Sequence, residues 1–234
     1  MKKHLCLFVA ILGLFVFFAA QANAQTANKS ADIIVKLGLT PYSSLTSEYE
    51  SKLYINGDLD NSRSGSSSDN GKIGFLLSVD GEQYINNNFA AGIGLSYLTS
   101  RKINNSQTIV SGFNLYALLK GKTNNLNKKD ANTPISLYAL GNIGLTFPSL
   151  SFQDSYIRNT KINVETANQG FYAAIGGGIE IKNFNIELLY QYFLLSGFES
   201  VSFTYYGDYY SGYADDTYKY SCLTLNIGYR FSLW

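Results

Sequence analysis

Six charged residues occupy regular positions in otherwise apolar or small-residue stretches of this 234-residue chain. In its stretch, each charge occupies the same alternate positions as the small and polar residues. If these stretches are extended strands, all six side chains point to the polar face. Grouped carboxylates and cations can form buried ion pairs or can act as a gate or proton path. We expect the structural role. The six residues are Lys36, Asp80, Glu82, Glu180, Glu187 and Arg230.

Two pairings are expected within this group, because an unpaired charge in a closed interior is costly. Arg230 is expected to face Glu187 or Glu180. Lys36 is expected to face Asp80 or Glu82.

A second chemical feature is the segment SFTYYGDYYSGYADDTYKY at 202–220. Tyrosine offers a large contact area at low entropic cost, and glycine and serine add adaptability, which is typical of binding loops. We expect an exposed hairpin; the alternative is a strand extension over a barrel mouth. The spacing of its aspartates fits no calcium-loop pattern. The candidate binding residues are Tyr205, Tyr206, Tyr209, Tyr210 and Tyr213.

Residues for nucleophilic or acid–base catalysis are scarce. The chain has one histidine, His4, and two cysteines, Cys6 and Cys222. Both His4 and Cys6 fall in a segment that we expect to be removed. Hydrolases commonly use a histidine base. We therefore predict no enzyme, no catalytic residue, no cofactor and no metal site, while an enzyme acting on lipid A or on peptides remains an alternative.

The elements that would position these residues are strands of strictly alternating character. In the last stretch, Leu223, Leu225, Ile227, Tyr229 and Phe231 alternate with threonine, asparagine, glycine and arginine. Such a period of two indicates a strand with one apolar face and one small or polar face. The pattern occurs in eight stretches, at 32–40, 72–82, 89–99, 112–120, 135–147, 171–182, 184–195 and 223–233.

Connection lengths predict how the strands are joined. Long connections at 42–70, 148–168 and 197–219 alternate with short ones near 85–88 and 183. This alternation favours an all-β, eight-stranded antiparallel up-and-down barrel with long loops at one rim. The Ser/Gly/Asn-rich connection at 42–70 is expected to be mobile.

The composition of the two faces decides which one points outward. A soluble, lipocalin-like barrel would carry charges on its outer face, yet the stretches at 89–99 and 135–147 contain none. Glycine, serine and asparagine suit a narrow interior instead. We therefore predict a transmembrane β-barrel whose apolar face meets lipid, with the soluble ligand-binding barrel as the alternative.

The N-terminus has the layout of a secretory signal peptide. Two lysines precede an apolar run at 5–20, which is shorter than the roughly 20 residues of a membrane-spanning helix. Ala22-Asn23-Ala24 follows as a cleavage site, so we predict a signal at 1–24 and one barrel domain at 25–234. Loss of Lys2 and Lys3 leaves 16 basic and 17 acidic residues, a formal charge of −1 that does not favour nucleic acid.

The closing stretch, LTLNIGYRFSLW, resembles the signal with which outer-membrane barrels engage the barrel-assembly machinery. Its pattern is a polar residue, a glycine, two hydrophobic residues and a terminal aromatic: Asn226, Gly228, Phe231, Leu233 and Trp234. Over roughly 31–234 the chain resembles the small eight-stranded outer-membrane family that includes OmpX, OmpW and the barrel domain of OmpA. It especially resembles the outer-membrane β-barrel domain proteins of Bacteroidota.

That resemblance implies an integral protein of the outer membrane of a Gram-negative bacterium. Eight strands enclose only enough room for side chains, so we do not expect an open pore. A structural or surface-interaction role is expected, with outer-membrane lipid and an extracellular protein or surface ligand as partners. The alternatives are transport of small hydrophobic molecules, as in OmpW-like proteins, and a barrel within a secretion or gliding apparatus.

Overall fold

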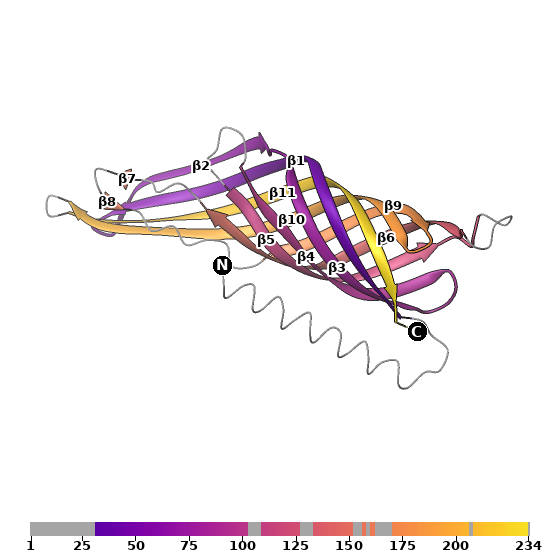
Figure 1. The fold of residues 1–234 in the computed structure, drawn as a ribbon. Helices are drawn as coiled ribbons and strands as arrows, with labels where there is room; N and C mark the ends of the chain where they lie inside the picture. The colour runs from indigo at the N-terminus through magenta and orange to yellow at the C-terminus, as the bar shows by residue number, and fades with distance from the viewer. Residues whose placement is uncertain are drawn as a thin grey trace.

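The computed structural model describes residues 31–102, 109–126, 133–151, 156–157, 160–161, 170–205 and 208–233 (Figure 1). The expected signal peptide lies outside these residues. Eight strands form a closed antiparallel barrel in which each strand pairs with the next and the last pairs with the first. These are β1 (Ala31–Ile55), β3 (Gly74–Tyr84), β4 (Phe89–Lys102), β5 (Ile109–Lys122), β6 (Ile135–Ser151), β9 (Gly170–Ile181), β10 (Phe184–Tyr205) and β11 (Asp208–Ser232).

The predicted eight-stranded up-and-down barrel is therefore confirmed. Three further strands lie outside the barrel wall: β2 (Asp58–Asn70) pairs with the distal half of β1, and β7 (Tyr156–Ile157) pairs with β8 (Thr160–Lys161). Within the described ranges, the chain forms no helix that is long and apolar enough to cross a membrane.

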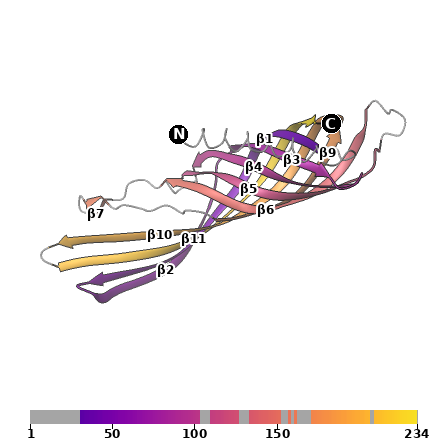
Figure 2. The ribbon, with the colours of Figure 1, turned by 90° about the horizontal axis from the view of Figure 1, so that it is seen from below.

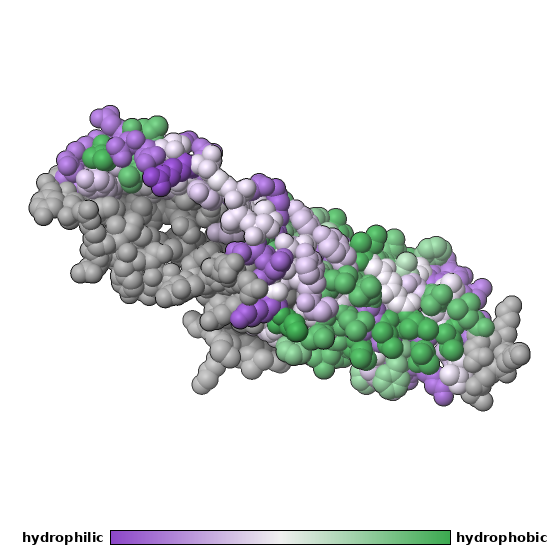
Figure 3. All heavy atoms as spheres, turned by 90° about the horizontal axis from the view of Figure 1, so that it is seen from above, coloured by the Kyte–Doolittle hydropathy of each residue, from purple (hydrophilic) through white to green (hydrophobic). Residues whose placement is uncertain are grey.

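Alternation along the strands separates an apolar exterior from a filled interior. Outward side chains such as Leu37, Ile143 and Ile175 are 64%, 60% and 68% exposed, whereas the opposite parity is buried. Figure 3 shows apolar residues gathered over the barrel, with hydrophilic residues on both sides of this apolar band. The apolar face thus points outward, which is the arrangement of a membrane barrel and the inverse of a lipocalin-like one.

A bulge at Thr40-Pro41 switches the parity of β1. Leu39 lies opposite Leu225 but Tyr42 lies opposite Leu223, so β1 contains one extra residue here. Proline has no N–H to donate to the ladder and is tolerated at bulges. Beyond it Tyr42 faces outward and Ser43 and Leu45 face inward.

Residues 42–70 form a hairpin with one register shift, between Leu53 and Tyr54, where the sequence predicted a loop without strands. The mobility predicted for this connection stays a prediction. β1 continues to Ile55, Asn56 and Gly57 turn the chain with φ of 51° and 96°, and β2 returns along β1. Asn-Gly with positive φ at both positions is the type I′ turn that matches the twist of paired strands. The distal half of β1 is held on its other edge by β11, which makes this hairpin part of a larger sheet.

Residues 197–219 form the tall hairpin expected from the sequence. β10 and β11 stay paired from Ser196 opposite Thr217 to Tyr205 opposite Asp208. Together with β2 and the distal half of β1, they make a four-stranded sheet in the order β10, β11, β1, β2. We call this sheet, residues 42–70 and 196–221, the extension; Figure 2 shows its strands running beyond the barrel.

Both described chain ends lie at the opposite rim from the extension. Asp32 pairs with Ser232 there, and the 85–88 and 182–183 turns close the same rim. The connection between β5 and β6 also lies at this rim, where Thr123 and Leu126 donate backbone hydrogen bonds to β6.

Inward-facing glycines make room for large side chains on neighbouring strands. A Cβ added at Gly94 would collide with the ring of Tyr116, and one at Gly38 would collide with Asn226. Gly178 similarly accommodates the ring of Tyr138. The small inward residues therefore leave the space that the large inward side chains of neighbouring strands fill.

This complementarity predicts that Gly94→Ala will destabilise the barrel by about 1–3 kcal/mol, the usual cost of overpacking. The measurement is the urea midpoint at which the compact, fast-migrating form is lost on a detergent gel.

Gly141→Ala is the matched control, because Gly141 faces outward and the nearest atom to its added Cβ is 3.9 Å away. It should unfold at the wild-type midpoint or slightly above it. Equal midpoints for the two variants would contradict the packing argument.

Candidate functional site

The first part of the interior polar network is centred on Lys36. Its Nζ lies 2.7 Å from Asp80 Oδ2 and 2.8 Å from Glu187 Oε2. The Tyr116 hydroxyl donates to Asp80 Oδ1 at 2.6 Å, and the Tyr138 hydroxyl donates to Glu187 Oε2 at 3.1 Å. The three charged side chains come from β1, β3 and β10 and are at most 4% exposed, so they bridge strands across the lumen.

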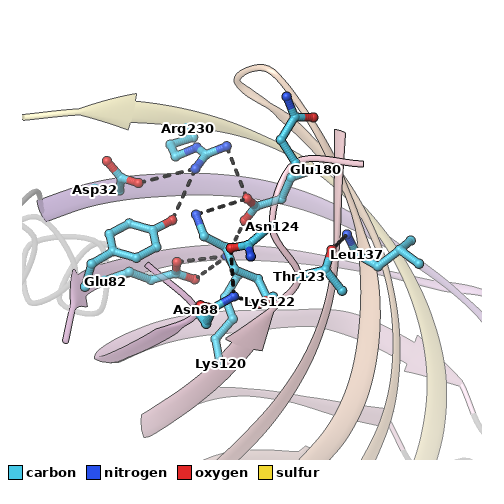
Figure 4. A network of polar contacts seen from close by, with 12 residues as sticks. Asp32, Glu82, Asn88, Lys120, Lys122, Thr123, Asn124, Leu137, Glu180 and Arg230 are labelled. Atoms are coloured by element: carbon cyan, nitrogen blue, oxygen red, sulfur yellow. Dashed lines mark hydrogen bonds and ion pairs between the residues drawn. The ribbon is translucent and has the colours of Figure 1, made fainter. Parts of the chain in front are cut away.

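The second part lies nearer the rim that carries the chain ends (Figure 4). Lys120 Nζ is 2.9 Å from Glu82 Oε2 and 2.6 Å from Glu180 Oε1. Arg230 approaches Glu180 Oε2 at 3.3 Å and Asp32 Oδ2 at 3.6 Å. Glu180 thus links two cations that come from β5 and β11.

Hydrogen bonds hold Arg230 in place at this rim. Its Nη1 donates to the Tyr84 hydroxyl at 3.2 Å, and its Nη2 donates to the Lys182 carbonyl at 2.6 Å. Lys122 lies 3.9 Å from Glu180 and 4.1 Å from the centre of the Tyr84 ring. The rim is therefore closed by a mixed layer of guanidinium, ammonium, carboxylate and phenol groups.

The structure brings all six predicted charged residues into these two clusters. Arg230 meets Glu180 rather than Glu187. Lys36 meets Asp80, and its second partner is Glu187 rather than Glu82. The cross-strand register, which the sequence does not specify, decides between these carboxylates.

Sequence reasoning missed three members of the network: Asp32, Lys120 and Lys122. Lys120 lies on the same parity as Asn114 and Tyr116, so the alternation of its own stretch could have identified it. Asp32 and Lys122 lie at strand ends, where parity alone does not show whether a side chain turns inward.

The described network contains four cations and five carboxylates within ion-pair distance. Buried charges are tolerated only when each has partners and hydrogen bonds. The observed arrangement meets that condition through shared carboxylates and tyrosine hydroxyls. It suits a rigid filling of the lumen, since the ion pairs link strands that are neighbours or two places apart in the barrel.

Uncharged layers continue the filling toward the extension. Gln191 Nε2 donates to Thr224 Oγ1 at 2.7 Å, and Asn114 Nδ2 donates to Ser96 Oγ at 2.9 Å. Beyond them lies a buried apolar layer. It contains Leu45, Leu76, Leu98, Phe193, Leu195, Tyr218, Tyr220 and Cys222.

The predicted assembly residues lie at the end of β11. Asn226 faces the lumen and donates to Glu187 Oε1 at 2.8 Å, and Gly228 is also inward. Phe231 is 50% exposed on the apolar exterior, while the Leu233 N–H donates to the Ala31 carbonyl at 2.9 Å. Trp234 lies outside the described residues.

The predicted binding tyrosines are at the distal end of the extension. Tyr209 is 50% exposed, while Tyr210 and Tyr213 are partly buried. Tyr213 stacks on Tyr54 of β1 with ring centres 6.2 Å apart. The side chain of Tyr205 and the whole of Tyr206 lie outside the described residues.

A polar latch joins the two hairpin tips of the extension. The Asn56 side chain donates to Asp208 Oδ1 at 2.8 Å and accepts from the Tyr209 N–H at 2.8 Å. Nearer the barrel, Lys219 lies 2.6 Å from Glu48. The hydrogen bond to Glu48 raises the pKa of Lys219 above its usual value. The described part of the chain holds no group of three or more potential metal ligands.

No protein-family model matches the chain, and no curated protein matches its sequence. Among solved structures it is similar to the outer membrane protein OprG from Pseudomonas aeruginosa. That match has 13% identity, covers 87% of this chain and 97% of the other, and has a TM-score of 0.50. The fold is that of a small outer-membrane β-barrel.

Two further structures match with lower scores. Neisserial surface protein A has 11% identity, with 82% of this chain and 99% of the other covered and a TM-score of 0.38. The attachment invasion locus protein Ail of Yersinia pestis has 16% identity, with 86% and 99% covered and a TM-score of 0.34.

The Lys36 cluster predicts a large effect of a single substitution. Lys36→Met leaves Asp80 and Glu187 buried without their shared cation, so the free energy of unfolding should fall by about 3–5 kcal/mol. Urea unfolding in detergent, followed by far-UV circular dichroism and gel mobility, measures the change.

Lys219→Met provides the control, because it also breaks an ion pair but one whose partners are 40% and 51% exposed. Its effect should be much smaller. Adding Asp80→Asn and Glu187→Gln to Lys36→Met should recover part of the loss. A Lys36→Met variant as stable as Lys219→Met would show that the cluster does not hold the barrel together.

Proposed function

We propose that this protein is an integral outer-membrane barrel that anchors a binding sheet, the extension, on the outside of a Gram-negative cell. The observation that carries the proposal is the combination of a filled barrel with an extension built from four of its own strands. Among the described residues the lumen is filled by side chains, which disfavours passage of solutes, whereas the rigid barrel wall can hold a protruding sheet in one orientation.

The exterior of the barrel supports insertion in a membrane. Its outward residues are almost all aliphatic or aromatic, and a water-exposed surface of this kind would be an aggregation hazard. Tyr42, Phe75 and Phe147 lie toward the extension side of this surface, and Phe89, Phe184 and Phe231 lie toward the other rim. Aromatic residues at both edges of an apolar band match the girdles of outer-membrane barrels.

The orientation follows from the even number of strands. Both ends of the described chain lie at one rim, and exported barrels of this architecture keep their short turns on the periplasmic side. The extension then projects outside the cell. Export would use the predicted signal peptide at 1–24, and insertion would use the assembly residues at the end of β11.

The described lumen charges suit a structural role better than catalysis or proton transfer. Lys36, Lys120 and Arg230 each contact two carboxylates, and the groups of the Lys36 cluster are almost fully buried. A reactive acid or base needs access to a substrate.

Labelling of single cysteines on intact cells tests location and orientation together. In a Cys222→Ser background, Ser66→Cys places a thiol on β2, and Asn87→Cys places one in the turn at the opposite rim. A membrane-impermeant maleimide should label Ser66→Cys on intact cells and Asn87→Cys only after the outer membrane is opened.

The gel shift on boiling provides the folding control, since both variants should keep a heat-modifiable band in the outer-membrane fraction. Labelling of Asn87→Cys on intact cells, or a soluble protein with no shift, would contradict the proposal. Uptake of a small apolar dye into liposomes only when the barrel is present would instead favour hydrophobic transport.

A further inference from the structure

Strand β2 is an open edge of the extension. Among the described residues it pairs only with β1 and ends the strand order of the sheet. It spans 13 residues, all but two of them exposed, and contains neither proline nor lysine. Exposed edges are usually short or protected by such residues, because unpaired N–H and C=O groups recruit other strands. β2 therefore offers an unusually long edge.

The register identifies which backbone groups point away from β1. The Gly71 N–H donates to the Ser43 carbonyl, one step beyond the pair of Asn70 with Ser44. In an antiparallel ladder hydrogen-bonded pairs alternate with non-bonded ones. From Asn61 to Asp69, beyond the register shift between Leu53 and Tyr54, the odd-numbered residues of β2 therefore bond to β1. The N–H and C=O groups of Ser62, Ser64, Ser66 and Ser68 consequently point toward the open edge.

The other edge of β1 agrees with this assignment. The Asn56 N–H donates to the Tyr209 carbonyl, which places even-numbered residues of distal β1 in hydrogen-bonded pairs with β11. Their odd-numbered neighbours are then free to bond to β2. Side chains on a strand point to the faces of the sheet, so those of the four serines leave the outward backbone groups of β2 accessible to another strand.

The charge of the extension indicates the kind of strand that fits. Residues 42–70 and 197–219 contain nine acidic and three basic residues, a formal charge of −6 in a chain whose total is +1. Two of the three basic residues are already paired, Lys52 with Glu50 and Lys219 with Glu48. On β2 itself Asp58, Asp60 and Asp69 outnumber Arg63. An anionic surface or a second copy of the extension would be repelled.

We propose that the open edge of β2 captures an extended, basic polypeptide segment by strand addition. Backbone hydrogen bonds from the four serines would supply the pairing, and the surrounding carboxylates would select lysine and arginine side chains. This inference rests on the proposed exposure of the extension outside the cell.

The test uses the full-length protein in detergent and two labelled ten-residue peptides. One peptide alternates lysine with threonine, and the other has glutamate in place of lysine. Fluorescence anisotropy should show binding of the lysine peptide only, weakened at least tenfold between 50 and 300 mM salt by charge screening. Hydrogen exchange should slow at Ser62–Ser68 when the lysine peptide is bound.

Proline substitutions test whether the outward N–H groups of β2 bind the peptide. Ser64→Pro with Ser66→Pro removes two outward N–H donors without touching the bonds to β1, and proline is accepted on edge strands in this position. Peptide affinity should fall at least tenfold. Ser64→Ala with Ser66→Ala keeps the N–H groups and should bind as the wild type does; a heat-modifiable band checks folding in both.

Equal binding of the two peptides, no binding of either, or unchanged affinity in the proline variant would overturn the inference. So would a purified protein that dimerises through β2. This test can be told apart from the test of the proposed function. If the lysine peptide binds in detergent but Ser66→Cys is not labelled on intact cells, strand addition at β2 stands and the proposed orientation in the membrane is overturned.

Discussion

The pairing of β1 with β11 is the contact on which the rest of the structure depends. It runs from Asp32 opposite Ser232 to Ile55 opposite Tyr210, and it joins the first described strand to the last. Within the barrel it removes the only two edges that an eight-stranded sheet would leave open, and unpaired backbone groups cannot be tolerated in hydrocarbon. Beyond the barrel the same pairing of β1 with β11 continues as the central strand pair of the extension.

Closure also determines the chemistry of the interior. An eight-stranded barrel leaves room for side chains and little else. Charged groups placed there must meet one another, and Glu180 of β9 links Lys120 of β5 to Arg230 of β11. The ion-pair clusters are therefore a consequence of closure, and they in turn resist any slip in register, because a one-residue shift would move these charges to the apolar exterior.

The extension has the opposite character. Its strands are long and its sequence is acidic, and backbone pairing and the latch between its tips hold the described residues together. Among its described residues, only those at its base add side chains to the buried apolar layer, namely Leu45, Tyr218 and Tyr220. A single layer of strands is a poor independent domain. The barrel compensates by holding β1, β10 and β11 in register at their base. The acidic serine edge can thus remain open without loss of the fold.

The sequence by itself determined the fold class, the eight stretches that form the barrel wall and the inward side of six charges, because alternation with a period of two is a local property of each strand. It did not reveal that residues 42–70 form a hairpin. Their serine and glycine content has little strand propensity, and only pairing with β11 on the far edge of β1 orders them. Nor could it show whether Lys36 meets Asp80, Glu82 or Glu187. That choice depends on the stagger between strands distant in sequence, which only the closed barrel specifies.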